Sequence, residues 1–349
     1  MTHRPPSALA LSLALSLAAT TLAAPAALAT GGGVGPATGA TPARPAPASS
    51  SDSPTTIIVQ LEDSTVGMRT FGPSTQSAHD AMRARIAAAV EGVVPGAQVT
   101  TVRDYTHALD GFAIEAPASA LSAIQQVEGV KAAFIEGTHK PMETAAEGSG
   151  APVLANASSL AMTRANQTTQ KGDGQVIEVI DSGLQTDHDA FSGSMDGVDV
   201  RMSQADAQAL AGTLPHGSAG TYVNSKIPFA YDYADNDATV VPTSTKDMSH
   251  GTHVAAIAAA NGGEVRGTAP NAQIIVAKVV HDADGVMDDS ALLAALDDAL
   301  VIKPDVINIS LGDDAGMSSD AGSIFAGVYE KLTDAGITVN AAAGNAFSN

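Results

Sequence analysis

Short apolar runs alternate with helical hydrophobic patterns from about residue 170 to the end of the chain. The runs lack the polar alternation of a half-exposed strand, and the segments between them repeat apolar residues with a helical period. Apolar strands separated by helices predict an α/β fold, in which helices cover both faces of a parallel sheet. The predicted strands are 176–180, 272–280, 306–311 and 337–342, and the predicted helices are 250–260, 290–300 and the one carrying Ile324, Val328 and Leu332.

A different pattern occupies residues 55–140. Its elements follow in the order βαββαβ, which predicts a small α+β unit with the split βαβ, or ferredoxin-like, arrangement. Its two histidines, His79 and His107, are isolated in the sequence, and we expect structural or surface roles for both. The predicted strands are 56–61, 98–103, 109–115 and 130–135, and the predicted helices are 77–93 and 121–127.

The first 29 residues have the pattern of a cleaved secretory signal peptide. A short basic start precedes an uncharged run over 8–24 and the small-x-small sequence Ala27-Leu28-Ala29. A transmembrane helix is the alternative, but the run is short for a bilayer and lacks a basic flank. We therefore expect export, with no membrane span after signal removal.

Two further segments, 30–54 and 141–160, lack periodicity and are rich in small residues, Gly and Pro. Such composition predicts linkers. The pattern is already lost from about residue 136, and we expect the second linker to be exposed and open to proteolytic maturation.

Composition narrows the functional classes. Asp and Glu number 37 against 17 Lys and Arg, which gives a net charge of −20. This acidic balance argues against binding to nucleic acid or to anionic lipid. The absence of cysteine excludes disulfides, Cys-zinc sites, iron–sulfur clusters and thiol nucleophiles.

Polar side chains follow the predicted strands at their carboxyl ends. Asp181 comes after the first strand, His250 opens a helix, and Asn345 follows the last strand. Ligands of parallel sheets bind at the carboxyl ends of strands, so we expect these side chains to meet. A carboxylate that orients an imidazole, an imidazole that acts as general base and an amide that donates to an oxyanion are parts of an acyl-transfer site.

Five motifs follow one another along the chain: V-I-D-S-G at 179–183, S-H-G-T-H-V-A at 249–255, G-T-A-P at 267–270, I-N-I-S-L-G at 307–312 and A-A-A-G-N at 341–345. In this order they resemble the motifs of the subtilisin-like serine proteases, or subtilases. Residues 55–140 are similar to the inhibitory propeptide of that family, so the resemblance spans the chain from about residue 55 onward. The stretch 222–236 looks like that of lactocepin-type cell-envelope proteinases and C5a peptidases.

The resemblance implies a role for each matching residue. Asp181 would be the triad carboxylate, His250 the general base and then the general acid, and Asn345 the oxyanion donor. The other matches concern the substrate: Ser310, Leu311 and Gly312 would form a backbone edge that pairs with a peptide, and Ala342, Ala343 and Gly344 would line the pocket for the side chain before the scissile bond.

The resemblance also implies a secreted or cell-envelope-associated endopeptidase that acts on proteins and peptides, with residues 55–140 as its intramolecular inhibitor. It implies no required cofactor. Calcium is a weaker expectation, because no EF-hand spacing is present. His253 lies one turn after His250, but the Glu of an H-E-x-x-H zinc motif is missing, so we expect a packed structural histidine and no metal site.

The nucleophile motif of the family, G-T-S, is missing. Gly-Thr pairs occur at 137, 212, 220, 251 and 267, and none is followed by Ser. We therefore expect residues 161–349 to be the N-terminal part of a catalytic domain, and the chain as given to be inactive and poorly stable alone. The alternative is a secreted, non-catalytic pseudo-protease that binds peptides. Another kind of α/β enzyme lacks support, because neither a G-x-G-x-x-G nor a G-x-S-x-G motif is in place.

Acidic pairs recur in this region. The simplest interpretation is solvated surface. The alternative is attraction of cationic substrate segments toward a cleft, for which Asp313 and Asp314 are best placed, next to the predicted substrate edge. The acidic groups are 282–284, 288–289, 297–298 and 313–314.

Overall fold

The computed structural model describes residues 53–62, 73–141, 160–243, 249–312 and 319–343. No helix within these ranges is both long and apolar enough to cross a lipid bilayer. Several predicted features lie outside the described residues: the signal peptide (1–29), nearly all of the linker 30–54, residues 142–159 of the maturation region, the acidic pair 313–314, and the site residues Gly344 and Asn345.

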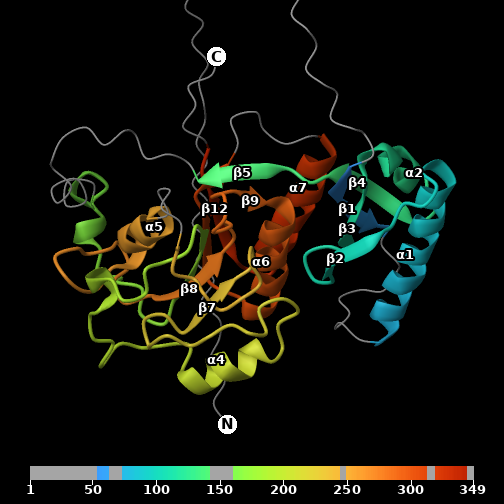
Figure 1. The fold of residues 1–349 in the computed structure, drawn as a ribbon. Helices are drawn as coiled ribbons and strands as arrows, with labels where there is room; N and C mark the ends of the chain where they lie inside the picture. Colours follow the sequence, from blue (N-terminus) through green and yellow to red (C-terminus); the bar gives the residue numbers. More distant parts are fainter. Residues whose placement is uncertain (1–52, 63–72, 142–159, 244–248, 313–318, 344–349) are drawn as a thin grey trace, which may run out of the picture. The chain divides into compact units, whose positions relative to one another are not determined.

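A five-stranded sheet forms the centre of the second half of the chain (Figure 1). Its strand order is β12-β10-β6-β8-β7, and every neighbouring pair is parallel, which confirms the predicted α/β fold class. Only β7 was not predicted from the sequence. The strands are β6 (Val176–Asp181), β7 (Phe229–Asp232), β8 (Gln273–Lys278), β10 (Val306–Ile309) and β12 (Thr338–Ala341).

The sheet is accompanied by four α-helices in the described part of this half. The helix α4 was not predicted. It begins with a capping box between Ser203 and Asp206, a local signal that the pattern analysis missed. The helices are α4 (Gln204–Ala211), α5 (His250–Ala259), α6 (Asp289–Ile302) and α7 (Ser319–Asp334), with short 3-10 turns η2 (Ala165–Gln167) and η3 (Asp189–Phe191).

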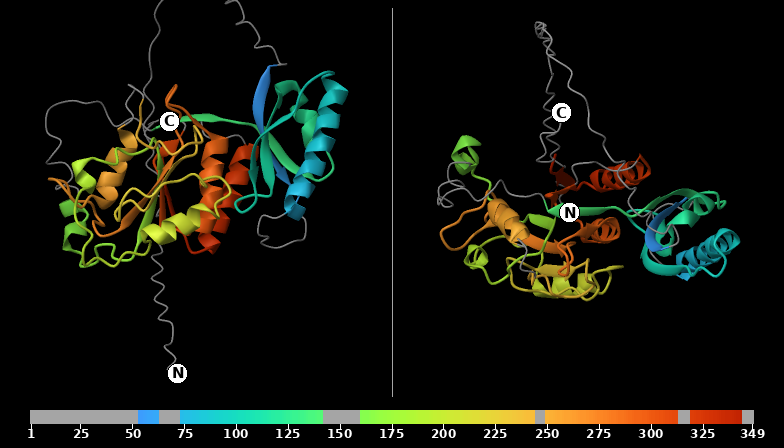
Figure 2. Two further views of the ribbon diagram at one scale, coloured as in Figure 1. Left: turned by 60° about the horizontal axis from the view of Figure 1, so that its bottom comes forward. Right: turned by 45° about the horizontal axis from the view of Figure 1, so that its top comes forward.

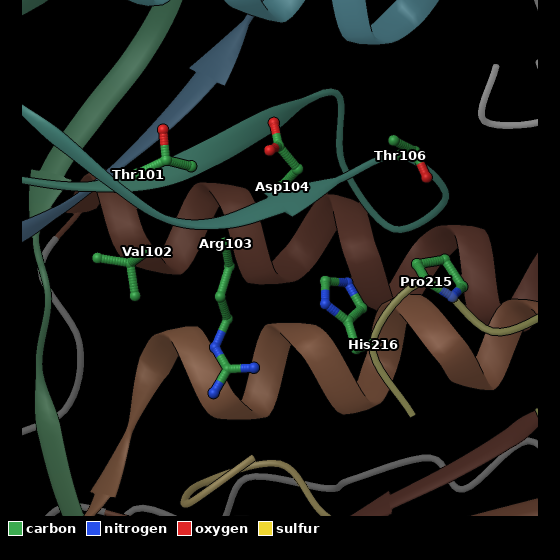
Figure 3. Close-up of a pocket in the computed structure, with 7 residues that line it drawn as sticks. All are labelled: Thr101, Val102, Arg103, Asp104, Thr106, Pro215 and His216. Atoms are coloured by element: carbon green, nitrogen blue, oxygen red, sulfur yellow. The ribbon is translucent and has the colours of Figure 1, made fainter. Parts of the chain in front are cut away.

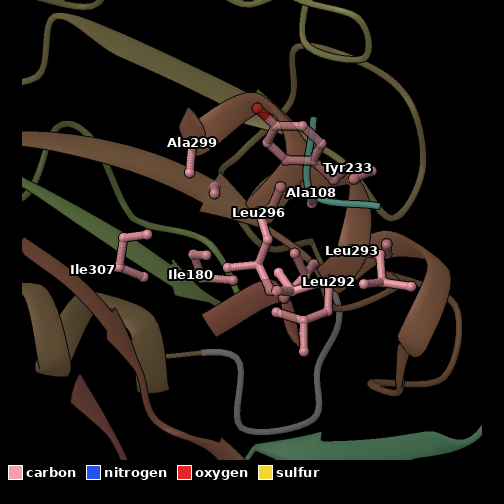
Figure 4. Close-up of a cluster of buried hydrophobic side chains, with 14 of the residues drawn as sticks. Ala108, Ile180, Tyr233, Leu292, Leu293, Leu296, Ala299 and Ile307 are labelled. Atoms are coloured by element: carbon pink, nitrogen blue, oxygen red, sulfur yellow. The ribbon is translucent and has the colours of Figure 1, made fainter. Parts of the chain in front are cut away.

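Helices cover both faces of this sheet, as predicted. Successive side chains of β6 alternate between two clusters: Val179 packs with Ala255 and Ala259 of α5, whereas Ile180 packs with Leu296 of α6. Figures 1 and 2 show α5 on one side of the sheet and α6 with α7 on the other, and Figure 4 labels Leu296 and Ile180 in their shared cluster. The polar residues that follow the strands are therefore left at the sheet's carboxyl edge.

Residues 54–135 form a smaller unit, called the N-terminal module below. Its four strands form an antiparallel sheet in the order β2-β3-β1-β4, and the element order βαββαβ is the predicted one. The elements are β1 (Pro54–Leu61), α1 (Pro73–Val93), β2 (Thr100–Tyr105), β3 (Gly111–Pro117), the 3-10 turn η1 (Ala118–Ala120), α2 (Leu121–Gln125) and β4 (Val130–Ile135).

The module buries both faces of its sheet. Ile57 and Val59 of β1 pack in one cluster with Ile86 of α1. Ile58 lies between them in the chain and points to the opposite face, where it belongs to the large cluster that also contains Phe134 and residues of α6 and α7. A continuous apolar core therefore joins the module to the helices of the larger sheet.

His79 ties α1 to the strands of the module. Its ring is 1% exposed, with Nδ1 2.9 Å from an Asp104 oxygen and Nε2 2.8 Å from an Asp110 oxygen. Burial alone would lower the pKa of His79, but the two carboxylates raise it to about 9. The predicted structural role is confirmed, although the residue is not isolated in space.

A third, small sheet has the strand order β11-β5-β9, with β5 (Thr138–Pro141) antiparallel to both β9 (Met287–Asp288) and β11 (Leu311–Gly312). The expectation of an exposed linker from residue 136 is therefore wrong for β5. Its pairing partners are at least 148 residues away in the chain, and no local pattern reports such contacts. The predicted strand 306–311 is interrupted at Ser310, so that Leu311 and Gly312 pair with β5 instead.

The helix α6 buries its acidic side chains as well as its apolar ones. Asp297 and Asp298 are fully buried and Asp289 is 2% exposed, so the interpretation of these residues as solvated surface is wrong. Backbone N–H groups of the module donate to Asp297, and the Tyr233 hydroxyl donates to Asp298. Contacts from distant segments replace the water that the sequence led us to expect.

The helix α6 begins at Asp289, one residue before the predicted start at 290, and its N-cap residue is Asp288. Ser290 lies inside the first turn, where its backbone N–H donates to a carboxylate oxygen of Glu136 at 2.7 Å. Burial raises the pKa of Glu136. The module thus supplies a partner for one free N–H of the helix.

Glu178 lies in the middle of the central strand β6 and is fully buried. Neither carboxyl oxygen has a hydrogen-bond partner among the described residues. Burial, and after it the nearby Asp298 carboxylate, together raise the pKa of Glu178 to about 8. The folded chain therefore keeps a proton that the unfolded chain releases, and wild-type stability should fall as the pH rises from about 4.5 to about 8.

Replacing this acid with an apolar side chain of similar shape should stabilise the fold. We expect Glu178→Met to raise the free energy of unfolding by about 2–4 kcal/mol at pH 8 and by less at pH 5. Urea unfolding at the two pH values measures this, with the exposed Glu264→Met as matched control. Equal stability of Glu178→Met and wild type at pH 8 would contradict the assignment of a buried, protonated carboxyl.

Candidate active site

Asp181 is the last residue of β6, the middle strand of the parallel sheet. The position puts its carboxylate at the carboxyl edge of the sheet, where α/β proteins bind ligands. The side chain is 1% exposed. Its Oδ1 accepts the backbone N–H of Ser182 at 2.7 Å, which fixes the orientation of the carboxylate.

His250 is the first residue of α5, and its Nδ1 lies 2.7 Å from Asp181 Oδ1. An ionised carboxylate only accepts hydrogen bonds, so Nδ1 carries the proton and donates it to Asp181. The other ring nitrogen, Nε2, is then the one available to take up a proton. The structure thus brings together the carboxylate and the imidazole predicted from the sequence.

Two glycines permit this close approach. A Cβ on Gly251 would overlap the backbone oxygen of Gly183 and lie 3.1 Å from Asp181 Oδ1. The backbone N–H of Gly251 donates to Ser182 Oγ at 3.0 Å, which joins the start of α5 to the end of β6. Gly183 has φ +104°, a conformation that other residues rarely adopt, and it turns the chain away after the strand.

The carboxylate of the Asp181–His250 pair is buried away from solvent. Asp181 Oδ2 is buried and has no hydrogen-bond partner among the described residues. His250 is 9% exposed. In a site of low dielectric, the negative carboxylate stabilises a positive imidazolium far more than it would in water, so the pair suits an imidazole that gains a proton during a reaction.

The predicted substrate edge is occupied by the chain itself. Gly312 is paired with Lys140 and Leu311 with Pro141, both in antiparallel register. On its other side, β5 is paired with β9, with Thr138 opposite Asp288. An extended segment held between two strands is the geometry of a peptide bound by β-augmentation.

The remaining predicted site residues are less informative. Ser310 is half-buried, and its Oγ accepts from Asn308 at 3.0 Å. Ala342 and Ala343 follow β12 and are exposed. Their predicted contribution to a side-chain pocket, and the oxyanion role of Asn345, stay predictions.

A cluster of acidic residues next to the dyad is filled by a lysine. Lys278 is fully buried, and its Nζ lies 2.5 Å from Asp232 and 3.2 Å from both Asp235 and Asp282. In the described parts of the chain, no three His, Asp or Glu side chains are arranged to hold a metal ion. The calcium expected from the family resemblance stays a prediction.

His253 differs from its prediction. Its side chain is exposed on α5, whereas we expected a packed histidine. The position faces solvent because α5 buries the face that carries Ala255 and Ala259.

Comparison with known proteins identifies the family. Residues 172–349 match the model of the Subtilase family, a family of peptidases. The chain belongs to the subtilases. The dyad Asp181–His250, the substrate edge and the parallel sheet all lie within the matched region.

Among relatives of this subtilase is the PI-type proteinase of Lactococcus lactis subsp. cremoris, which is 34% identical over 246 residues. The match covers 68% of this chain and 12% of that proteinase. The C5a peptidase of Streptococcus pyogenes is 28% identical over 184 residues, covering 50% of this chain and 15% of the relative. The chain thus spans about an eighth of the length of the first of these relatives. Both belong to the group that the stretch 222–236 indicated.

A solved structure with a similar arrangement is the epidermin leader peptide processing serine protease of Staphylococcus aureus. It aligns with a TM-score of 0.49 at 14% identity, covering 84% of this chain and 60% of the other.

The pair His139 and Asp289 was not predicted from the sequence. His139 Nε2 lies 2.8 Å from Asp289 Oδ1, and the two side chains are 6% and 2% exposed. His139 fell in the expected linker and Asp289 in an acidic pair that we assigned to the surface. Neither residue lies in a motif of its own, so only the pairing of β5 with β9 brings them together.

Proposed function

We propose that this subtilase is a serine endopeptidase in which Asp181 orients His250 as the general base. The observation that carries the proposal is the buried contact of 2.7 Å between His250 Nδ1 and Asp181 Oδ1 at the carboxyl edge of the parallel sheet. The membership in a family of serine peptidases supports it.

The proposed reaction is acyl transfer. His250 Nε2 takes the proton of a serine hydroxyl as the serine oxygen attacks the peptide carbonyl carbon, and Asn345 donates to the resulting oxyanion. The C–N bond then breaks, and the imidazolium gives its proton to the leaving amine. A water molecule, deprotonated in the same way, releases the acyl group. Asp181 stabilises the imidazolium in both steps.

The 349-residue sequence does not contain the nucleophile motif of the family, since none of its Gly-Thr pairs precedes a serine. We propose that the active protease carries this serine in additional sequence, and that residues 1–349 alone do not cleave peptides. A secreted pseudo-protease that binds peptides without cleaving them is the second candidate.

The N-terminal module is proposed to act as an inhibitory propeptide. The pairing of β5 with β11 and β9 supports this, because it leaves no free strand edge there for a substrate. The apolar core shared by the module and α6 supports a role in folding as well. Together with the signal-like N-terminus, this organisation favours a protein that is secreted or held at the cell envelope.

Expression of the gene with its natural downstream sequence tests the proposal. We expect the product to hydrolyse a fluorescein-labelled protein and to react with a fluorophosphonate probe, which labels activated serines. The chain ending at Asn349 is the control, and it should do neither. If the natural reading frame stops after Asn349 and its product still binds peptides without cleaving them, the pseudo-protease is correct.

A further inference from the structure

The segment β5 presents one side chain to a buried acid. His139 of β5 is opposite Met287 in the register with β9, and its ring nitrogen Nε2 lies 2.8 Å from Asp289 Oδ1. Both side chains are more than nine-tenths buried. A peptide bound in this register therefore places one of its side chains directly against Asp289.

The recorded partners of the Asp289 carboxylate all come from the bound segment. Oδ1 contacts His139, and Oδ2 accepts the backbone N–H of Gly137 at 2.8 Å. The backbone N–H of Asp289 in turn donates to the Gly137 oxygen at 3.2 Å. When β5 leaves, this buried acid loses both donors, and an incoming peptide must replace them or leave the carboxylate with water alone.

The surroundings add no positive charge. No Lys or Arg in the described ranges forms an ion pair with Asp289, whose one salt-bridge partner there is His139. Burial raises the pKa of the Tyr329 hydroxyl on α7. The nearby Asp289 carboxylate is the second cause of this rise. An unpaired buried carboxylate is costly, so a cationic or N–H-donating side chain is the partner it favours.

The bound segment also has to approach closely. A Cβ on Gly137 would lie 3.0 Å from Asp289 Oδ2 and 3.3 Å from His139 Nε2. Two residues before the donor, the peptide therefore needs a glycine or another small residue, because a larger side chain would push the backbone N–H away from Oδ2.

We propose that Asp289 is a specificity-determining residue of the endopeptidase, which selects peptides with His, Lys or Arg at the position that His139 occupies. The inference rests on the proposed peptidase function and names its substrate class. Asp289 touches the bound peptide but not the reacting atoms, so it acts on substrate choice.

Two measurements test this independently of each other. In the 349-residue chain, hydrogen exchange of residues 137–141 compares His139→Lys with His139→Leu. We expect lysine to keep β5 protected and leucine to raise its exchange about tenfold, because leucine leaves Asp289 Oδ1 without the donor that His139 provides. Equal exchange of the two variants would overturn the proposal, whether or not the protein is a peptidase.

In the active protease, digestion of a peptide library followed by mass spectrometry compares wild type, Asp289→Asn and the control Asp284→Asn. Asp284 is exposed in the turn before β9 and accepts only the local N–H of Val286. We expect basic residues to be enriched at one fixed position before the cleaved bond, and Asp289→Asn to lower this enrichment about tenfold. Cleavage without any enrichment, or enrichment that survives in Asp289→Asn, overturns the inference. No cleavage by wild type contradicts the peptidase function instead.

Discussion

Replacing His250 with alanine is expected to lower kcat/KM for peptide hydrolysis by a factor on the order of 10⁴–10⁶ in the active protease. In the proposed mechanism the imidazole takes the serine proton as a base and protonates the leaving amine as an acid, so its loss affects both halves of the reaction. Among the described residues, no second base contacts the buried Asp181, whose Oδ1 lies 2.7 Å from His250 Nδ1.

The same helix offers a matched control for this prediction. His253 lies one turn later and is exposed, so His253→Ala removes an imidazole without touching the dyad. We expect its kcat/KM to stay within about twofold of wild type, and circular dichroism should show both variants folded. A His250→Ala protein that retains more than a tenth of wild-type activity would mean that the Asp181–His250 pair is not the catalytic dyad.

The dyad could be predicted because both of its residues belong to local patterns. Asp181 ends an uninterrupted apolar strand, and His250 precedes an Ala-rich helix. A strand that is buried on both faces is a continuous apolar run, so its end can be located in the sequence. The carboxyl ends of parallel strands lie at one edge of the sheet. The start of the helix can approach the end of the strand because Gly251 and Gly183 have no side chains at the point of contact.

The occupant of the substrate edge could not be predicted in the same way. The segment 138–141 is four residues long and pairs with residues that follow about 150 and 170 positions later. Such a strand is specified by the edges on either side of it and not by its own periodicity. Its composition, with Gly137 before it and Pro141 at its end, is that of a loop.

The acidic residues of α6 were mistaken for surface for a related reason. An Asp pair in a sequence normally indicates solvent exposure, since charged groups are buried only when they are paired. Here the partners come from the loop after β2 and from the segment around His216, which the sequence does not connect to α6. Arg103 and His216 line the same pocket beside this contact (Figure 3).

The contact between the module and α6 is organised around one carboxylate. Asp297 accepts hydrogen bonds from the backbone N–H groups of Thr106 at 3.2 Å, His107 at 2.8 Å and Ala108 at 2.6 Å. The ring nitrogen Nε2 of His216 lies 3.3 Å from the same carboxylate. Three successive N–H groups that converge on one anion form a nest. The module thus contributes donors, and the larger unit contributes the charge.

Asp297→Ala should therefore destabilise the 349-residue chain by about 3–5 kcal/mol at pH 7, because it leaves one buried and three half-buried donors without their acceptor. Burial alone would raise the pKa of Asp297, but the hydrogen bonds from His107 and His216 outweigh it and hold the pKa well below its usual range. A carboxyl with a lowered pKa stabilises the fold above about pH 4 and loses this contribution as the pH falls further. The difference between the variant and wild type should then shrink in acid.

Urea unfolding at pH 7 and at pH 3 measures both effects. Asp334→Ala, which removes an exposed carboxylate from the last turn of α7, should stay within about 0.5 kcal/mol of wild type at pH 7. If Asp297→Ala unfolds at the wild-type urea midpoint, Asp297 contributes nothing to holding the module. If the loss of stability is as large at pH 3 as at pH 7, the donors matter but the ionisation of Asp297 does not, because at pH 3 the carboxyl of the unfolded chain is largely protonated and a charge-dependent contribution must be smaller there.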